Sequence, residues 1–203
     1  MADLRILLDG PIVAVDYRCT ATPDERPYTE VFRRHSLAYV RQGSFGCHSR
    51  GRQFDLVAGS MLVGFAGDEY RCTHDHHECR DECLSFQLAP ERVAGIGSGN
   101  ATHAWRIGSL PPLPQMMVLG ELAQAVADGR SDLAIDEVGM IMAARFVALA
   151  TDTVLAPGAL RAHDRRRAAT AALWIDAHAG QDIDLGSAAA EVGERVVVGG
   201  AGG

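Results

Sequence analysis

Residues 51–70 have the sequence GRQFDLVAGSMLVGFAGDEY, and this stretch decides the fold of the chain. Its second half, Met61-Leu62-Val63-Gly64-Phe65, repeats a period-two rhythm that also occurs at 37–40 and 84–88. Turn residues flank it at Ala58-Gly59-Ser60 and Gly67-Asp68. Such alternation, broken by closely spaced turns, predicts short strands in a β sandwich or barrel rather than a parallel sheet.

The chain changes character after Pro90. A glycine-rich link at 95–100 and the run Pro111-Pro112-Leu113-Pro114 are followed by two stretches, 116–128 and 132–151, with apolar residues at helical spacing. Gly129-Arg130-Ser131 separates them, which predicts a helical hairpin in which Ser131 or Asp132 caps the second helix. Either these helices cover the open face of the β structure, or they form a subunit interface.

Residues 164–193 have the pattern of the beginning of a helix-turn-helix unit. The first predicted helix has Asp164 as its N-cap, Gly180 as its stop and one face formed by Ala168, Ala171, Ala172 and Ile175. A second helix is predicted from Asp184, its cap, to the turn residue Gly193, with small residues where a partner helix must pack closely.

The residues from Glu194 onward do not continue this pattern. Three consecutive valines, 196–198, and a run of glycines make a poor helix and offer no side chains that read bases. We therefore expect no competent recognition helix in 194–203. Ser187, Ala188 and Gly193 are then a remnant of a DNA-binding unit.

Two segments of the chain resemble one known family. Residues 172–193 are similar to the opening of the DNA-binding domain of AraC-family transcriptional regulators, and residues 51–70 resemble the strand-turn-strand core of a cupin, the sensor domain of the same regulators. The resemblance implies an α+β fold with a cupin-like β-barrel (jelly roll) at 1–100, a helical covering or dimerisation segment at 101–160 and a truncated DNA-binding domain at 161–193, followed by an unrelated tail at 194–203.

Metal-dependent cupins bind their ion through histidines and a glutamate in two motifs, and this chain departs from both. Gly59 and Gly67 fit the second motif, but Phe65 stands at the proline and Tyr70 at the histidine, while Arg52 lies near the place of the glutamate. A metal centre needs three or four converging ligands. We therefore expect no cupin metal centre and no enzymatic activity.

A different set of ligands lies at 72–83. The segment contains six candidate ligands within twelve residues, and thiolates mixed with imidazoles are preferred by zinc and other soft transition metals. The candidate metal ligands are Cys72, His74, His76, Cys79 and Cys83. They converge if 71–74 and 83–88 are neighbouring strands, with Cys47-His48 as a further donor. The alternative is an exposed polar loop with incidental thiols.

Charge and composition narrow the function classes. A formal net charge of −7 argues against autonomous binding to nucleic acid, because phosphate affinity comes largely from clustered Lys and Arg. No apolar run approaches the roughly 18 residues of a membrane span, and the start of the chain does not resemble a signal peptide. Five cysteines without an export signal favour reduced thiols or metal ligands over disulfides. We expect a cytoplasmic protein.

These patterns support one main hypothesis and one alternative. The main hypothesis is a homodimeric AraC-type regulator that senses a small molecule or metal and whose relatives of full length bind DNA, whereas this chain does not. The alternative is a metal- or thiol-binding cupin module, sensor or metalloenzyme, that uses the cluster between Cys72 and Cys83.

Overall fold

The computed structural model describes residues 2–21, 25–74, 81–96, 101–152 and 162–191. The chain divides into two compact units, Met1–Ala156 and Pro157–Gly203. Within the described ranges, no helix has the length and apolar character needed to cross a membrane.

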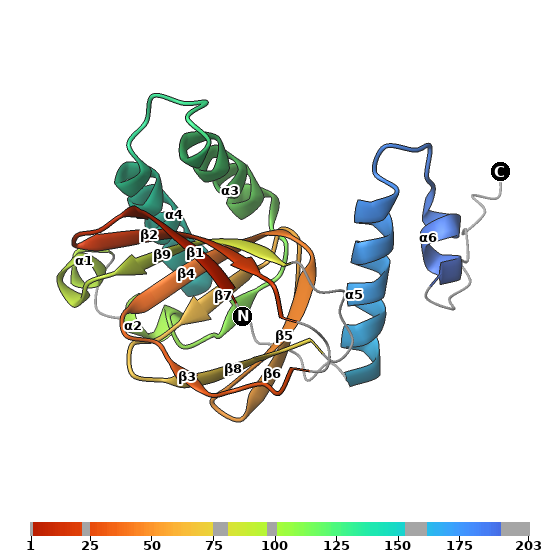
Figure 1. Cartoon of the computed structure of the whole chain (residues 1–203), viewed down its shortest axis with the longest axis horizontal. Helices are drawn as coiled ribbons and strands as arrows, with labels where there is room; N and C mark the ends of the chain where they lie inside the picture. Colours follow the sequence, from red (N-terminus) through yellow and green to blue (C-terminus); the bar gives the residue numbers. More distant parts are fainter. Residues whose placement is uncertain (1, 22–24, 75–80, 97–100, 153–161, 192–203) are drawn as a thin grey trace. The chain divides into compact units, whose positions relative to one another are not determined.

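The first unit is built on two antiparallel sheets (Figure 1). The larger sheet has the strand order β1-β2-β9-β4-β7-β10 and the smaller one the order β3-β8-β5-β6. The strands are β1 Ala2–Leu8, β2 Ile12–Cys19, β3 Glu30–Val31, β4 His35–Gln42, β5 Ser44–Ser49, β6 Arg52–Val57, β7 Met61–Gly64, β8 Glu69–Thr73, β9 Glu82–Leu88 and β10 Ser109–Leu110. The expected α+β fold with a small β sandwich is present, as two facing sheets rather than one closed barrel in the described part of the chain.

The period-two pattern assigns each strand residue to one of two hydrophobic clusters. In β4, Leu37 and Tyr39 belong to a cluster on the helical side of the larger sheet, whereas Ala38 and Val40 belong to a cluster that contains residues of both sheets. We call the second one the inter-sheet cluster; its buried members are Phe32, Ala38, Val40, Phe45, Cys47, Phe54, Leu56, Leu62 and Cys83. Because successive side chains of a strand point to opposite faces, the larger sheet is buried on both sides at β4.

Helices cover the outer face of the larger sheet (Figure 1). They are α1 Pro90–Ala94, α2 Ala101–Ala104, α3 Pro114–Ala127 and α4 Ile135–Asp152. The predicted hairpin is therefore present, and Met116, Ala123, Met142 and Phe146 are buried against the sheet. The predicted cap of the second helix was wrong, because α4 begins at Ile135 and Glu137 accepts a hydrogen bond of 3.3 Å from the backbone N–H of Ala134 instead.

Two glycines allow α3 and α4 to approach the sheet closely. A Cβ atom at Gly120 would lie 2.5 Å from the ring of Tyr39, and one at Gly139 would lie 2.6 Å from the ring of Phe86. The hydroxyl of Tyr39 then donates a hydrogen bond of 2.8 Å to Glu121. The helices are thus held by aromatic packing and by a polar contact at the edge of that packing.

The second unit contains α5 Ala162–Ala177 and α6 Leu185–Glu191. The predicted start of its first helix was wrong: α5 begins at Ala162, so Asp164 lies inside the helix rather than at its N-cap. The predicted face was wrong in part, because Ala168 and Ile175 are exposed whereas Ala169 is buried. Alanine and histidine before Asp164 continue the helix without a barrier, which explains the earlier start.

The prediction for the second helix of this unit holds at its N-terminus. A carboxylate oxygen of Asp184 accepts a hydrogen bond of 2.8 Å from the backbone N–H of Ser187, the geometry of an N-cap. Ala188 is buried, as a small residue at a helix contact should be. Gly193 and the residues predicted not to form a recognition helix lie outside the described residues.

Candidate functional site

Three potential metal ligands meet where strands of both sheets end. Cys19 is the last residue of β2, Asp81 precedes β9, and His74 follows β8. The backbone N–H of Cys19 donates a hydrogen bond of 2.9 Å to the carbonyl of Asp81, which extends the β2–β9 ladder by one residue. Pairing in the larger sheet therefore sets Cys19 beside Asp81, and β8 brings His74 from the smaller sheet.

The three side chains converge on one point. The Sγ atom of Cys19 lies 3.4 Å from Nε2 of His74, and a carboxylate oxygen of Asp81 lies 2.9 Å from the same Nε2. The three ligand atoms all lie within 4.8 Å of one another. Among the residues that the structure describes, they form the one group of three such ligands.

This group is buried and electrostatically coupled. Cys19 is 5% exposed and Asp81 is 3% exposed. Hydrogen bonds to Asp81 and then to Cys19 raise the pKa of His74 to about 10, against the opposing effect of burial. A buried carboxylate is costly unless a partner compensates its charge, so Asp81 requires either a protonated imidazole or a cation at this position.

The same geometry argues against nucleophilic catalysis. In a Cys-His-Asp arrangement the thiol and the carboxylate contact opposite nitrogens of the imidazole, so that one nitrogen accepts a proton while the other is oriented. Here Cys19 and Asp81 both contact Nε2 of His74. Three donor atoms that point to a shared position are instead typical of metal coordination.

The predicted ligand set is separated in the structure. β8 pairs with β3 and β5, whereas β9 pairs with β2 and β4, so the expectation that 71–74 and 83–88 are neighbouring strands was wrong. The two strands belong to different sheets. Of the predicted ligands, His74 lies in the convergent group, Cys72 and Cys83 face the inter-sheet cluster, and His76 and Cys79 lie outside the described residues.

The thiols of the inter-sheet cluster are poorly suited to react. Cys47 and Cys72 are directly opposite each other in the β5–β8 ladder, and a side-chain hydrogen bond with Cys47, together with burial, raises the pKa of Cys72 well above its usual value. Burial also raises the pKa of Cys83. Since the thiolate is the reactive species, the raised pKa values predict low reactivity of these two cysteines at neutral pH. His48 alternates with Cys47 and points to the other face of β5.

Tyr70 and Arg52, which stand near ligand positions of the cupin metal motifs in the sequence, make aromatic contacts in the structure. Tyr70 stacks on Phe32 with ring centroids 4.0 Å apart, and the guanidinium of Arg52 lies over the ring of Phe54. Neither side chain is a metal ligand here.

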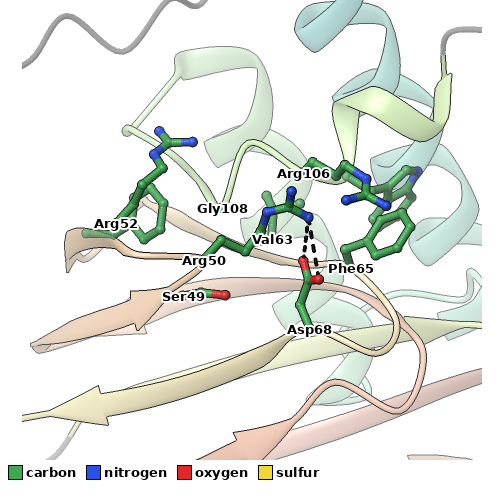
Figure 2. A pocket seen from close by; sticks show the side chains of 10 residues that line it. Ser49, Arg50, Arg52, Val63, Phe65, Asp68, Arg106 and Gly108 are labelled. Atoms are coloured by element: carbon green, nitrogen blue, oxygen red, sulfur yellow. Dashed lines mark hydrogen bonds and ion pairs between the residues drawn. The ribbon is translucent and has the colours of Figure 1, made fainter.

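A second candidate is a hollow lined by arginines (Figure 2). Arg50, Arg52 and Arg106 surround it, but Arg50 is paired with Asp68 at 3.1 Å and Arg106 lies 3.9 Å from the ring centroid of Phe65. The hollow has a volume of about 10 Å³, roughly the space of one water molecule. In this conformation it does not admit a small-molecule effector.

Both tryptophans have packing roles. Trp105 is fully buried and contacts Phe146 edge to face at 5.0 Å. Trp174 in α5 stacks on His178, with ring centroids 4.4 Å apart.

A groove of about 680 Å³ lies in the first unit, between the β1–β2 turn and the first half of α4.

Comparison with known proteins finds similar folds only among solved structures. No family model and no curated protein matches the chain. The AraC-like transcriptional activator CuxR matches over 95% of this chain and 70% of its own, with 14% identity and a TM-score of 0.50. A cupin superfamily protein from Desulfitobacterium hafniense matches over 44% of this chain and 78% of its own, with 15% identity and a TM-score of 0.37.

The likeness to CuxR concerns the fold. It extends over both compact units, so the fold of CuxR is shared over the β sandwich, the helical pair and the helices of the second unit. The AraC resemblance of the sequence is thus confirmed at the level of structure.

The group formed by Cys19, His74 and Asp81 was not predicted from the sequence, because Cys19 lies 55 residues before His74.

Proposed function

We propose that this chain is an AraC-type transcriptional regulator whose cupin-like unit senses a ligand. The observation that carries the proposal is the fold likeness to CuxR over 95% of the chain. The capped helix α6 after α5 supports it, because a helix that begins at Asp184 with a small buried residue at Ala188 suits the first helix of a helix-turn-helix unit. The cupin-like unit is, in this proposal, a sensor rather than an enzyme.

DNA binding by this chain on its own is not expected. Sequence recognition requires a helix that presents side chains to the major groove, and 194–203 is rich in glycine and valine. The test compares the chain with a version in which residues 194–203 are replaced by the remainder of an AraC-type DNA-binding domain. Both are passed through selection from a random duplex pool and then measured by fluorescence anisotropy.

The extended protein should enrich a defined sequence and bind it with strong salt dependence, whereas the original chain should not. Failure of the folded, extended protein to select any sequence would contradict the proposal. Selective binding by the original chain would show that residues 194–203 do not prevent DNA recognition.

We also propose that the regulator forms a homodimer through its helical pair. Val118 on α3 and Ile141 on α4 are exposed by 69% and 47%, although both are large and apolar. Large exposed apolar side chains such as these are candidates for a subunit interface. Light scattering after gel filtration should give a dimer for the chain and a monomer for Val118→Glu or Ile141→Glu, and a monomeric original chain would refute dimerisation.

A further inference from the structure

We infer that Cys19, His74 and Asp81 form a binding site for a divalent cation of the zinc class. The inference deepens the proposed function by naming the ligand of the sensor unit, and it rests on that function only in treating the cation as an effector. The site shares one residue, His74, with the ligand set predicted from sequence. It also uses one thiol rather than several.

The distances suit a small tetrahedral ion. With metal–ligand bonds of about 2.0–2.3 Å, ligand atoms around zinc lie roughly 3.3–3.6 Å apart. The Sγ atom of Cys19 and Nε2 of His74 are already 3.4 Å apart. The carboxylate oxygen of Asp81 is 2.9 Å from Nε2, about half an ångström closer than around zinc, and it lies within 4.8 Å of the Sγ atom. Rotation of the carboxylate and of the thiol side chain can adjust both distances.

The donor set identifies the class of ion. One thiolate and one imidazole favour zinc and chemically similar ions over magnesium or calcium, which prefer oxygen ligands. Three protein ligands leave one position of a four-coordinate ion for water. One atom, Nε2 of His74, faces both the sulfur of Cys19 and the carboxylate of Asp81. A cation satisfies all three ligand atoms together.

An ion bound at this site would connect the two sheets. Cys19 and Asp81 belong to the larger sheet, whereas His74 follows a strand of the smaller one. A bound ion therefore joins the two sheets at one end of the sandwich. Binding to the folded state alone raises its stability in proportion to the logarithm of ion concentration.

The test uses the full chain, purified without a tag and treated with chelator. Zinc titration against a chromophoric chelator should give one bound equivalent, with affinity reduced at least tenfold in Cys19→Ser, His74→Gln and Asp81→Asn. Cys47→Ser and His103→Gln serve as matched controls, because they remove a buried thiol and an exposed imidazole outside the group, and they should retain binding. Unchanged affinity in the first three variants, or no bound zinc, would overturn the inference.

A second measurement needs no substitution and therefore stays informative if a variant fails to fold. X-ray absorption at the zinc edge of the loaded chain should give one sulfur neighbour and otherwise nitrogen or oxygen. Two or three sulfur neighbours, or none, would place the ion elsewhere and overturn the inference. Neither measurement contains DNA, so failure of the DNA-selection experiment leaves this result unaffected, and the converse also holds.

Discussion

Arg41 of β4 donates a hydrogen bond of 2.6 Å from Nη1 to Oε1 of Gln124 on α3. Its Nη2 lies 3.2 Å from a carboxylate oxygen of Glu82 and also forms an ion pair with Asp16. The β4–β9 register shifts between Val40 and Gln42, so Arg41 sits at a bulge that directs its side chain to all three partners. One guanidinium thereby joins β2, β9 and α3.

Replacing this arginine should be costly. Arg41 is 9% exposed and Asp16 5%, so Arg41→Met leaves a buried carboxylate without its closest partner. We expect a loss of about 3–5 kcal/mol in the free energy of unfolding, measured by urea denaturation. Arg50→Met is the control: its ion pair with Asp68 is more exposed, at 40% and 21%, and its loss should stay below about 1 kcal/mol. Equal effects of the two substitutions would contradict this account.

The buried His35 should make the fold less stable in mild acid. Burial, and then the charge of Arg106, lower its pKa below 6.5, although Asp68 acts in the opposite direction. As the pH falls below about 6.5, the unfolded chain takes up a proton on this imidazole before the folded chain does, so stability falls with it. Neither ring nitrogen has a hydrogen-bond partner among the described residues.

The pH effect can be isolated with His35→Phe, which keeps aromatic contacts with Phe65 and Trp105. The difference in unfolding free energy between the original chain and this variant should shift in favour of the variant as the pH is lowered from 7 towards 5. His103→Gln, at an exposed position, should leave the slope unchanged. A pH-independent difference would show that His35 titrates alike in both states.

The close contact at Gly120 should make alanine destabilising despite its better helix propensity. Alanine gains up to about 1 kcal/mol over glycine within a helix, but the added Cβ would overlap the ring of Tyr39. Overpacking of this kind typically costs about 1–3 kcal/mol. We expect a lower Tm for Gly120→Ala and an almost unchanged Tm for Gly95→Ala, whose Cβ would make only ordinary contacts. A raised Tm for Gly120→Ala would show that α3 can move away from the sheet.

The raised pKa values of Cys72 and Cys83 predict that neither responds to oxidants. At pH 7.5 both should react with iodoacetamide more than about tenfold more slowly in the native chain than in urea, because little thiolate forms in the inter-sheet cluster. Peptide mass spectrometry measures each site separately. Rapid native labelling of either cysteine would revive the alternative of a thiol-redox sensor.

The features predicted correctly from the sequence are those that depend on a local pattern of residues. The alternation of Leu37 and Tyr39 with Ala38 and Val40 gave two faces, and the structure has two clusters there. The partner of His74 could not be found in this way, because it depends on which strands pair. Cys19 meets Asp81 only through the β2–β9 register, and nothing local to 72–83 indicates that β8 and β9 belong to different sheets. A search for cysteines at strand ends would have included Cys19.

The proposed cation site should communicate with α3 through Glu82 and Arg41. Asp81, a proposed ligand, is adjacent to Glu82, and Arg41 connects Glu82 to Gln124. An ion that fixes the start of β9 should therefore slow amide hydrogen exchange in α3, a region whose local opening is sensitive to such contacts. Measured by mass spectrometry, exchange in 114–127 should slow when zinc is added.

Gln124→Met tests whether this particular contact carries the effect. Gln124 is only partly buried, so the variant should fold, bind zinc with unchanged affinity and lose most of the zinc-dependent protection of α3. A matched change, Glu121→Gln, keeps a hydrogen-bond acceptor for Tyr39 and should preserve the protection. Protection that persists in Gln124→Met would mean that the ion stabilises the helix through the shared hydrophobic core, since coupling through packing needs no single polar contact.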